Sequence, residues 1–201
     1  MVRPVRDLGG AGTLGGGFTL IEILSVIIIL GIAAALIIPQ IGQRGDLQAA
    51  AAARVIMADM LYAQNLAIAT QGNPKGQSPN PQPYVFVSFD RTDVPNNYGL
   101  YYYKSATNQL IALTHPVNAN SYVMTFGGTG PNTLSNVTLV SANFGNNQPI
   151  LAFDATGTPY YYNSTTKTAT LLSGAGTVVV ASGTYSLTIS VEQDTGDVSV
   201  Q

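Results

Sequence analysis

One long apolar run near the N-terminus constrains this chain more than any other feature. From Phe18 to Ile38 the sequence reads FTLIEILSVIIILGIAAALII, which is 21 residues with a single charge, Glu22. At a rise of 1.5 Å per residue, a helix of this length measures about 30 Å, the thickness of the hydrocarbon core of a bilayer. The run therefore predicts a membrane-spanning helix, and the length of 201 residues leaves room for one further domain of ordinary size.

Two arginines, Arg3 and Arg6, precede the apolar run. Positive charge on a short flanking segment favours its retention in the cytoplasm, so we expect the rest of the chain to lie across the membrane. A secretory signal peptide has a shorter apolar region, of about 7–15 residues, and its small-residue cleavage site follows that region. Here Gly15, Gly16 and Gly17 precede the run, so the run should stay in the mature protein. On hydropathy alone, a plain signal anchor remains an alternative.

The composition argues against most catalytic and metal chemistry. The sequence has no cysteine and one histidine, His115, so thiolate nucleophiles and cysteine metal sites are ruled out. Only 9% of the residues are charged, against about 25% in an average protein. No basic stripe is present to neutralise a phosphate backbone. We therefore expect no enzyme, no cofactor, no metal and no nucleic-acid partner, and we expect His115 to be solvated and without a partner.

Glu22 is the exception within the apolar run. A carboxylate inside an apolar membrane helix costs about 2.5–3.5 kcal/mol, so an unpaired one suggests a function. Glu22 lies one helical turn after Phe18. If the chain were cut between Gly17 and Phe18, the new α-amino group could pair with Glu22 of a neighbouring subunit and offset both charges. A glutamate that reaches the lipid headgroups is the other interpretation, and the residues alone leave both open.

The start of the apolar run also resembles a known signal. The residues Gly17-Phe18-Thr19-Leu20-Ile21-Glu22 are similar to the class III signal of type IV pilins and type II secretion pseudopilins. The resemblance implies cleavage after Gly17 by prepilin peptidase and N-methylation of Phe18. It also implies that Phe18 and Glu22 take part in subunit assembly.

Two further residues match pilin helices. Gly31 and Pro39 stand where those helices carry a glycine and a helix-breaking proline. Proline has no N–H group, so Pro39 removes one helical hydrogen bond and should kink or loosen the turn before it. We therefore predict helix breaks at Gly31 and Pro39.

A second helix is predicted from about Asp46, which can cap its N-terminus, to Ala69. The residues Gln71-Gly72-Asn73-Pro74 supply the stop signal. Apolar residues recur at steps of three or four and predict one continuous face that packs on the chain's own domain. These residues are Leu47, Ala51, Val55, Ala58, Tyr62, Leu66 and Ala69.

From Tyr84 onward the hydrophobic period changes from 3.6 to 2, as in β-strands. The clearest alternation runs from Tyr185 to Val191, and the turn from Asp194 to Asp197 then predicts a hairpin with a short last strand. Short strands joined by such turns predict a compact, mostly antiparallel unit. Strands are predicted at 84–89, 98–103, 110–113, 122–126, 137–140, 150–153, 160–162, 178–180, 185–191 and 198–200.

The predicted fold class is α+β. A long N-terminal helix, transmembrane and then amphipathic, is expected to pack on a C-terminal antiparallel β-sheet head, as in pilins. The predicted division is a leader peptide at 1–17, a transmembrane or filament-core helix at 18–41, an amphipathic helix at 42–71 and a β-rich globular head at 72–201.

The head carries a second resemblance. The segment Phe153–Pro159, which reads FDATGTP, and the later turn at Thr195 and Gly196 resemble the GspH/FimT-type pseudopilin domain over roughly residues 46–201. DNA-binding minor pilins of the FimT type carry basic residues near the C-terminus, whereas this chain ends in TGDVSVQ. The departure disfavours duplex binding.

Two pairs of acidic residues are a weaker indication, of a metal site. Asp90 with Asp93, or Asp194 with Asp197, could supply oxygen ligands to calcium. Turn aspartates that accept hydrogen bonds from their own backbone are the commoner explanation.

These patterns predict a minor pseudopilin or minor pilin of a type II secretion pseudopilus or type IV pilus. The expected partners are other pilin or pseudopilin subunits, prepilin peptidase and the inner-membrane assembly platform. The expected location is the inner membrane, as a single-pass protein with a periplasmic head, before assembly into a periplasmic pseudopilus or extracellular pilus. Two alternatives remain: a major structural pilin, and a membrane-anchored periplasmic binding domain or enzyme.

Overall fold

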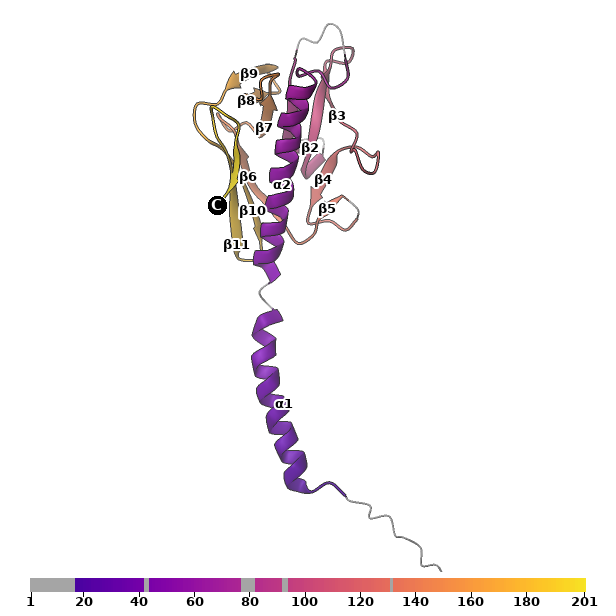
Figure 1. Ribbon diagram of the computed structural model, residues 1–201, viewed down its shortest axis with the longest axis vertical. Helices are drawn as coiled ribbons and strands as arrows, with labels where there is room; N and C mark the ends of the chain where they lie inside the picture. The colour runs from indigo at the N-terminus through magenta and orange to yellow at the C-terminus, as the bar shows by residue number, and fades with distance from the viewer. Residues whose placement is uncertain (1–16, 42–43, 77–81, 92–93, 131) are drawn as a thin grey trace, which may run out of the picture. The chain divides into compact units, whose positions relative to one another are not determined.

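The computed structural model describes residues 17–41, 44–76, 82–91, 94–130 and 132–201, and among these it leaves out the side chains of 35–41, 44, 90–91 and 94–95. The chain divides into two units, Met1–Gly42 and Gln43–Gln201. Each unit is described by itself below (Figure 1).

The first unit contains helix α1 (Leu20–Ile41). Its Ile- and Leu-rich sequence carries one acidic residue, Glu22, in the first turn. The helix is not interrupted at Gly31 or Pro39, where the sequence predicted breaks. It ends at Ile41, two residues after Pro39, so the hydrogen bond that proline removes lies near the helix end. In the part of the chain that the structure describes, no helix is both long enough and apolar enough to cross a membrane.

The second unit begins with helix α2 (Arg44–Ala69). Five consecutive alanines, 49–53, give its first half the highest helix propensity available. The helix ends where the stop signal predicts: Gln71 and Gly72 both have positive φ, and the Gly72 N–H donates to the carbonyl oxygen of Ala67 at 2.7 Å. A Cβ at Gly72 would collide with the carbonyl oxygen of Pro83, so glycine is needed there.

Two β-sheets follow (Figure 1). The larger has the order β5-β4-β2-β1-β7-β8-β9, with β3 also paired to β2. The smaller has the order β12-β11-β10-β6, and all of its pairs are antiparallel. The strands are β1 (Val85–Arg91), β2 (Val94–Lys104), β3 (Gln109–Ala112), β4 (Val123–Phe126), β5 (Thr133–Leu134), β6 (Thr138–Asn143), β7 (Ile150–Phe153), β8 (Pro159–Asn163), β9 (Thr168–Leu171), β10 (Gly176–Ser182), β11 (Tyr185–Val191) and β12 (Val198–Val200).

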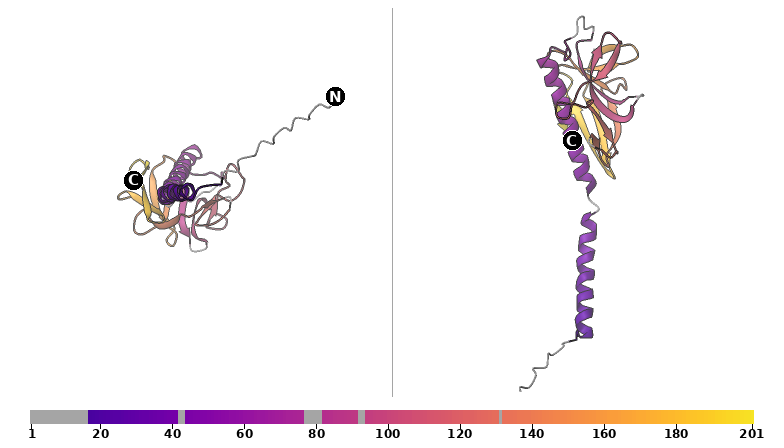
Figure 2. Two further views of the ribbon diagram at one scale, coloured as in Figure 1. Left: turned by 90° about the horizontal axis from the view of Figure 1, so that it is seen from below. Right: turned by 90° about the vertical axis from the view of Figure 1, so that its right-hand side faces the viewer.

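The main core lies between α2 and the inner faces of both sheets. Figures 1 and 2 show α2 running along one side of the two sheets. Its buried face is made mostly of alanine, which lets the strands approach the helix closely. The helix contributes Ala52, Ala53, Ile56, Met60, Ala63 and Ala67 to this core, and the sheets contribute Val85, Val87, Phe89, Tyr98, Leu100, Leu151, Phe153, Val178, Val180, Ile189 and Val191.

A second cluster covers the outer face of the larger sheet. Phe86, Tyr101, Tyr103 and Tyr162 are at most 5% exposed, and the rings of Phe86 and Tyr162 meet edge to face at 4.9 Å. Alternate residues of a strand point to opposite faces, so the tyrosine-rich strands β2 and β8 can supply both clusters.

The prediction of which face of α2 is buried is wrong. Leu47 is 70% exposed, Val55 38% and Tyr62 37%, and Ala51, Ala58 and Ala69 are exposed too. Of the predicted set, Leu66 packs against the core and the ring of Tyr62 stacks on that of the core residue Tyr122. The buried face lies on another side of the helix, along residues 49, 52, 53, 56, 60, 63 and 67. Both sides of α2 are rich in alanine and larger apolar residues, so periodicity alone selected the wrong one.

The strand predictions agree with the structure for ten of the twelve strands. The prediction missed β5 and β9: β5 has only two residues, and β9, of sequence TATL, has one large apolar residue. The α+β class and the mostly antiparallel pairing of the head are confirmed, but the strands form two sheets instead of one, and β4 pairs with β5 in parallel.

Candidate functional site

The predicted cleavage site lies just before the first turn of α1. Gly17, Phe18 and Thr19 are outside the helix, and Phe18 is 78% exposed. The Glu22 N–H donates to the carbonyl oxygen of Thr19 at 3.0 Å and reaches its hydroxyl at 3.3 Å, so Thr19 acts as the N-cap. The peptide bond between Gly17 and Phe18 therefore lies in exposed, non-helical backbone, the kind of segment that proteases cleave.

Glu22 lies in the first helical turn, three residues after the N-cap Thr19. This spacing is that of a capping box, and a carboxylate here interacts favourably with the positive end of the helix dipole. The side chain is exposed, and among the described residues it has no ion-pair or hydrogen-bond partner.

The described part of α1 presents large apolar side chains on all sides. Eleven residues between Phe18 and Ile32 are 46% to 84% exposed. Burying one such side chain fully contributes about 1.5–3 kcal/mol, so these exposed side chains form a surface at which burial would be favourable. Among the described residues, apart from the helix's own backbone, a Cβ placed on Gly31 would meet nothing within 4 Å, so packing against them does not require glycine there.

The head contains a half-buried carboxylate that joins α2 to the larger sheet. The hydroxyl of Tyr98 donates to Oδ2 of Asp59 at 2.7 Å, and that of Tyr122 donates to Oδ1 at 2.9 Å. Burial raises the pKa of Asp59 above its ordinary value, although both hydrogen bonds and the nearby His115 oppose this. Burial and the neighbouring Asp59 raise the pKa of Tyr98 and of Tyr122. These two hydrogen bonds hold α2 against the larger sheet, and we call this arrangement the Asp59 clamp.

His115 is part of the same cluster, so the expectation that it has no partner is wrong. Its ring packs against that of Tyr122 in a tilted arrangement, with 4.4 Å between the ring centroids, and its Nδ1 accepts a hydrogen bond from the Val117 N–H at 3.2 Å. The ring of Tyr62 lies 5.8 Å from that of Tyr122. No sequence pattern indicates this cluster, because its members come from positions far apart in the chain.

Gln64 of α2 joins the two turns that carry the second resemblance. Its Nε2 donates to the carbonyl oxygen of Gly157 at 3.0 Å and to that of Thr195 at 2.9 Å. Gly157 and Gly196 have φ of +84° and +69°, a conformation that glycine adopts at little cost. The motif residues were visible in the sequence, but the glutamine that brings the two turns together was not.

The first of these turns is organised by Asp154. Its Oδ1 accepts hydrogen bonds from the Thr156 N–H at 2.8 Å, the Thr156 hydroxyl at 2.7 Å and the Thr158 N–H at 3.0 Å. Burial alone would raise the pKa of Asp154, but these bonds and one from Tyr160 outweigh it and hold the pKa below its ordinary value. Asp154 is thus a turn residue bound to its own backbone.

The acidic pairs do not gather into a metal site in the described structure. Asp194 and Asp197 are exposed on the turn between β11 and β12, and the Asp197 N–H donates to the Thr195 hydroxyl. No group of three or more candidate ligands occurs among the described residues. Asp93 and the side chain of Asp90 lie outside them.

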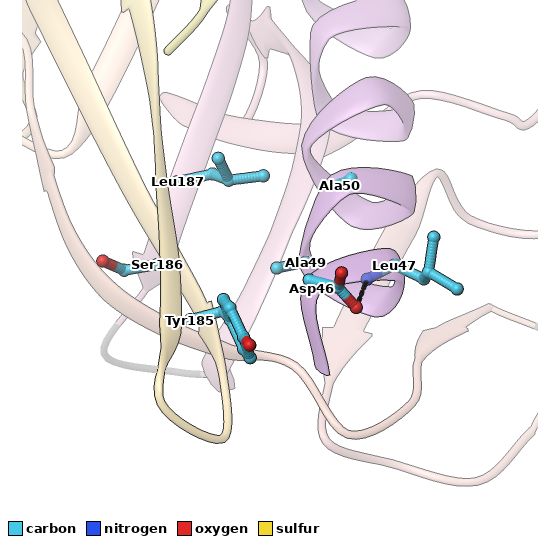
Figure 3. A pocket seen from close by; sticks show the side chains of 7 residues that line it. All are labelled: Asp46, Leu47, Ala49, Ala50, Tyr185, Ser186 and Leu187. Carbon is cyan, nitrogen blue, oxygen red and sulfur yellow. Dashed lines mark hydrogen bonds between the residues drawn. The ribbon is translucent and has the colours of Figure 1, made fainter. Parts of the chain in front are cut away.

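A hollow of about 290 Å³ lies between the first turns of α2 and strand β11 (Figure 3). Leu187 and Tyr185 face Ala49 and Ala50 across it, and Asp46 is its one carboxylate. The lining is mostly apolar and lacks the convergent polar groups of a substrate site.

Comparisons with known proteins give little further guidance. No family model matches the chain, and no curated protein matches it. Among solved structures, the minor pseudopilin EpsH from the type 2 secretion system of Vibrio cholerae is similar, with 11% identity and a TM-score of 0.47. The match covers 77% of this chain and 96% of that one. A similarity at this level does not decide the function of the chain.

Proposed function

We propose that this chain is a structural subunit of a pseudopilus or pilus, a minor pseudopilin or minor pilin of the GspH/FimT type. Prepilin peptidase removes residues 1–17, Phe18 is N-methylated, and the mature subunit assembles through its N-terminal helix. The protein performs no chemistry of its own. Its role is mechanical, and the head displays the recognition surface of the subunit.

The observation that carries the proposal is the coincidence of three features at one helix start. A glycine, an aromatic residue and a glutamate stand in the register of the class III signal, an apolar run follows them, and the bond to be cleaved is exposed outside the helix. A plain signal anchor accounts for the apolar run alone.

Before assembly the subunit is held in the inner membrane by the apolar run of residues 18–38. Arg3 and Arg6 keep the N-terminus in the cytoplasm, and the head lies in the periplasm. After cleavage, the assembly platform passes the helix from lipid to the filament core, where apolar helices of other subunits replace the lipid contacts.

Glu22 sets the axial register in this mechanism. The α-amino group of Phe18 on one subunit pairs with Glu22 of a neighbour, and each charge offsets the cost of burying the other. A subunit out of register would leave both charges unpaired in an apolar core. The exposed carboxylate of Glu22 is consistent with this use.

Replacing Glu22 tests the assembly step separately from cleavage. Glu22→Gln keeps the size and removes the charge, so the chain should still be cut after Gly17 but should be lost from sheared filaments. Ser25→Ala is the matched control: its hydroxyl bonds only the carbonyl oxygen of Glu22 within the same helix. Incorporation of Glu22→Gln at the wild-type level would contradict the register mechanism.

The abundance of the chain in those filaments separates a minor subunit from a major one. A major pilin would dominate the sheared material, whereas a minor subunit would be a small fraction of it. A membrane-anchored periplasmic domain, the remaining alternative, would not enter filaments at all.

A further inference from the structure

The hollow between α2 and β11 lies at the end of the head where the chain enters it. The first turns of α2 and the first residues of β11 line this hollow (Figure 3). Asp46 of the lining follows Ile41, the last residue of α1, by only five positions. A chain of five residues spans at most about 18 Å, so a medium that surrounds the end of α1 also lies within reach of the hollow.

Apolar side chains line the hollow and continue outside it. Tyr185 and Leu187 of β11 face the alanines of α2 across it. Figure 3 shows Leu47 on the side of α2 that points away from β11, where it is 70% exposed, and Tyr185 is 43% exposed. Burying a side chain of this size fully contributes about 1.5–3 kcal/mol, so this end of the head favours an apolar neighbour.

The volume of the hollow limits what it can hold. It measures about 290 Å³, whereas pockets that enclose a drug-sized ligand measure about 300–1,000 Å³. An occupant must therefore place only a part of itself in the hollow and extend out of it. A lipid chain meets this requirement, and so does a side chain of another protein.

Asp46 supplies the one charge of the lining. Its Oδ1 accepts a hydrogen bond from the Leu47 N–H at 2.7 Å, and in the described structure its other oxygen has no partner. A carboxylate attracts an ammonium group and repels a second anion. The lining thus combines an apolar surface with attraction for a cation, and phosphatidylethanolamine has both complementary parts, acyl chains and a headgroup ammonium.

We propose that this end of the head binds the membrane surface, with the hollow holding part of a phospholipid whose headgroup carries an ammonium, as in phosphatidylethanolamine. Tyr185 then lies at the level of the lipid headgroups, where tyrosine is enriched in membrane proteins. The proposal rests on the proposed function only in that α1 must lie in the bilayer. The lipid contact holds the head at the membrane until the subunit leaves for the filament.

The absence of tryptophan from the sequence allows a direct test by fluorescence. Tyr185→Trp places the only tryptophan beside the hollow. Ile68→Trp is the matched control, because Ile68 is 48% exposed and lies about 30 Å from Leu47 along the same helix. Each full-length variant is reconstituted in vesicles of phosphatidylethanolamine and phosphatidylglycerol, in which some lipids carry a nitroxide near the headgroup. The nitroxide should quench Tyr185→Trp several-fold more strongly than Ile68→Trp.

A second substitution tests the choice of headgroup. The quenching of Tyr185→Trp should fall when phosphatidylglycerol replaces phosphatidylethanolamine, because Asp46 then has no ammonium to pair with. Asp46→Asn, added to Tyr185→Trp, keeps the size of the side chain and removes the charge, so this dependence on the headgroup should disappear. Asp194→Asn removes an exposed acid from the turn after β11 and is the control that should preserve the dependence.

Equal quenching of Tyr185→Trp and Ile68→Trp would overturn the proposal. A blue shift of the Tyr185→Trp emission that grows with protein density, without quenching by the labelled lipids, would also overturn it and would assign the hollow to a second copy of the chain. A headgroup dependence that survives Asp46→Asn would refute the pairing with the ammonium. Protease resistance of the head checks that all variants fold.

The N-terminal residue of each variant keeps this test distinct from that of the proposed function. The lipid contact needs the apolar run in the bilayer but does not need the cut after Gly17. Specific quenching in cell membranes of a chain that retains Met1 would support the contact and refute the processing. A chain cut after Gly17 whose Tyr185→Trp variant is quenched no more than Ile68→Trp would do the reverse.

Discussion

The hydroxyl of Tyr98 donates a 2.7 Å hydrogen bond to Oδ2 of Asp59, and this bond fastens strand β2 to helix α2. Tyr98 is fully buried, so its hydroxyl depends on this carboxylate for a partner. The second oxygen of Asp59 accepts a hydrogen bond from Tyr122, which directly precedes β4. One carboxylate therefore holds two neighbouring parts of the larger sheet against the helix.

Removing Asp59 should destabilise the head. Asp59→Ala deletes the acceptor of both bonds and leaves the buried hydroxyl of Tyr98 without a partner, which we expect to cost about 2–4 kcal/mol of unfolding free energy. Denaturant unfolding measures the change. Glu192→Ala, which removes an exposed acid on the turn after β11, is the control and should stay within about 0.5 kcal/mol. An Asp59→Ala chain as stable as the control would contradict the clamp.

The raised pKa of Asp59 also makes the stability of the head depend on pH. Its native pKa is raised above the ordinary value of 3.8, so the native state binds the proton more tightly than the unfolded chain. This contribution to stability is full below the unfolded pKa and is lost as the pH rises through the native pKa. The stability of the wild type relative to Asp59→Asn should therefore increase as the pH falls from 7 to 4. A difference that stays constant, or falls, would show that the carboxyl is not desolvated.

The stability of the wild type must be measured relative to Asp59→Asn at each pH, because Asp154 changes the stability with pH in the opposite direction. Its native pKa is lowered, so its contribution is present above the unfolded pKa and lost as the pH falls. Asp154 is unchanged in Asp59→Asn, so its contribution cancels between the two chains.

Gln64 should be needed to hold its two turns together. Gln64→Ala removes two hydrogen bonds to carbonyl oxygens, at about 0.5–1.5 kcal/mol each. Hydrogen exchange should speed up in the turns at 154–158 and 193–197. The control is Asn65→Ala, the next residue of α2, whose side chain bonds only the carbonyl oxygen of Leu61 in its own helix. Unchanged exchange in both turns of Gln64→Ala would refute this role.

Gly196 should tolerate a side chain less well than Gly183. Both have positive φ, +69° and +60°, so alanine at either position pays a similar backbone strain of about 1–2 kcal/mol. A Cβ at Gly196 would also lie 2.7 Å from Nε2 of Gln64 and 2.9 Å from the carbonyl oxygen of Gly157, whereas a Cβ at Gly183 meets nothing within 4 Å. Thermal unfolding should therefore rank Gly196→Ala below Gly183→Ala, and equal stability would show that the turns can separate freely.

Helix α2 shows which structural features the sequence pattern predicts and which it does not. The end of α2 was predictable because Gly72 and Pro74 act locally, through φ and the missing N–H group. Its buried face was not, because the choice between two apolar sides depends on where the sheets lie. Ala53 and Ile56 face the sheets, while Val55 and Leu47 do not.

In the sheets too, the features that the sequence predicts have local causes, and the features that it does not predict depend on residues far apart in the chain. Strand β11 was visible from alternation alone, since Ile189 and Val191 are buried while Ser186 is exposed. The two-sheet arrangement was not visible, because it is set by pairs far apart in sequence, such as Val87 with Leu151. The clamps of Asp59 and Gln64 depend on the same distant pairings.

The N-terminal residue and intact mass of the chain isolated from membranes test the central claim most directly. We predict a mature chain that begins with N-methylated Phe18, and we predict the loss of that species in cells without prepilin peptidase. A chain that retains Met1, or one cut after Ile38 instead of after Gly17, would contradict it.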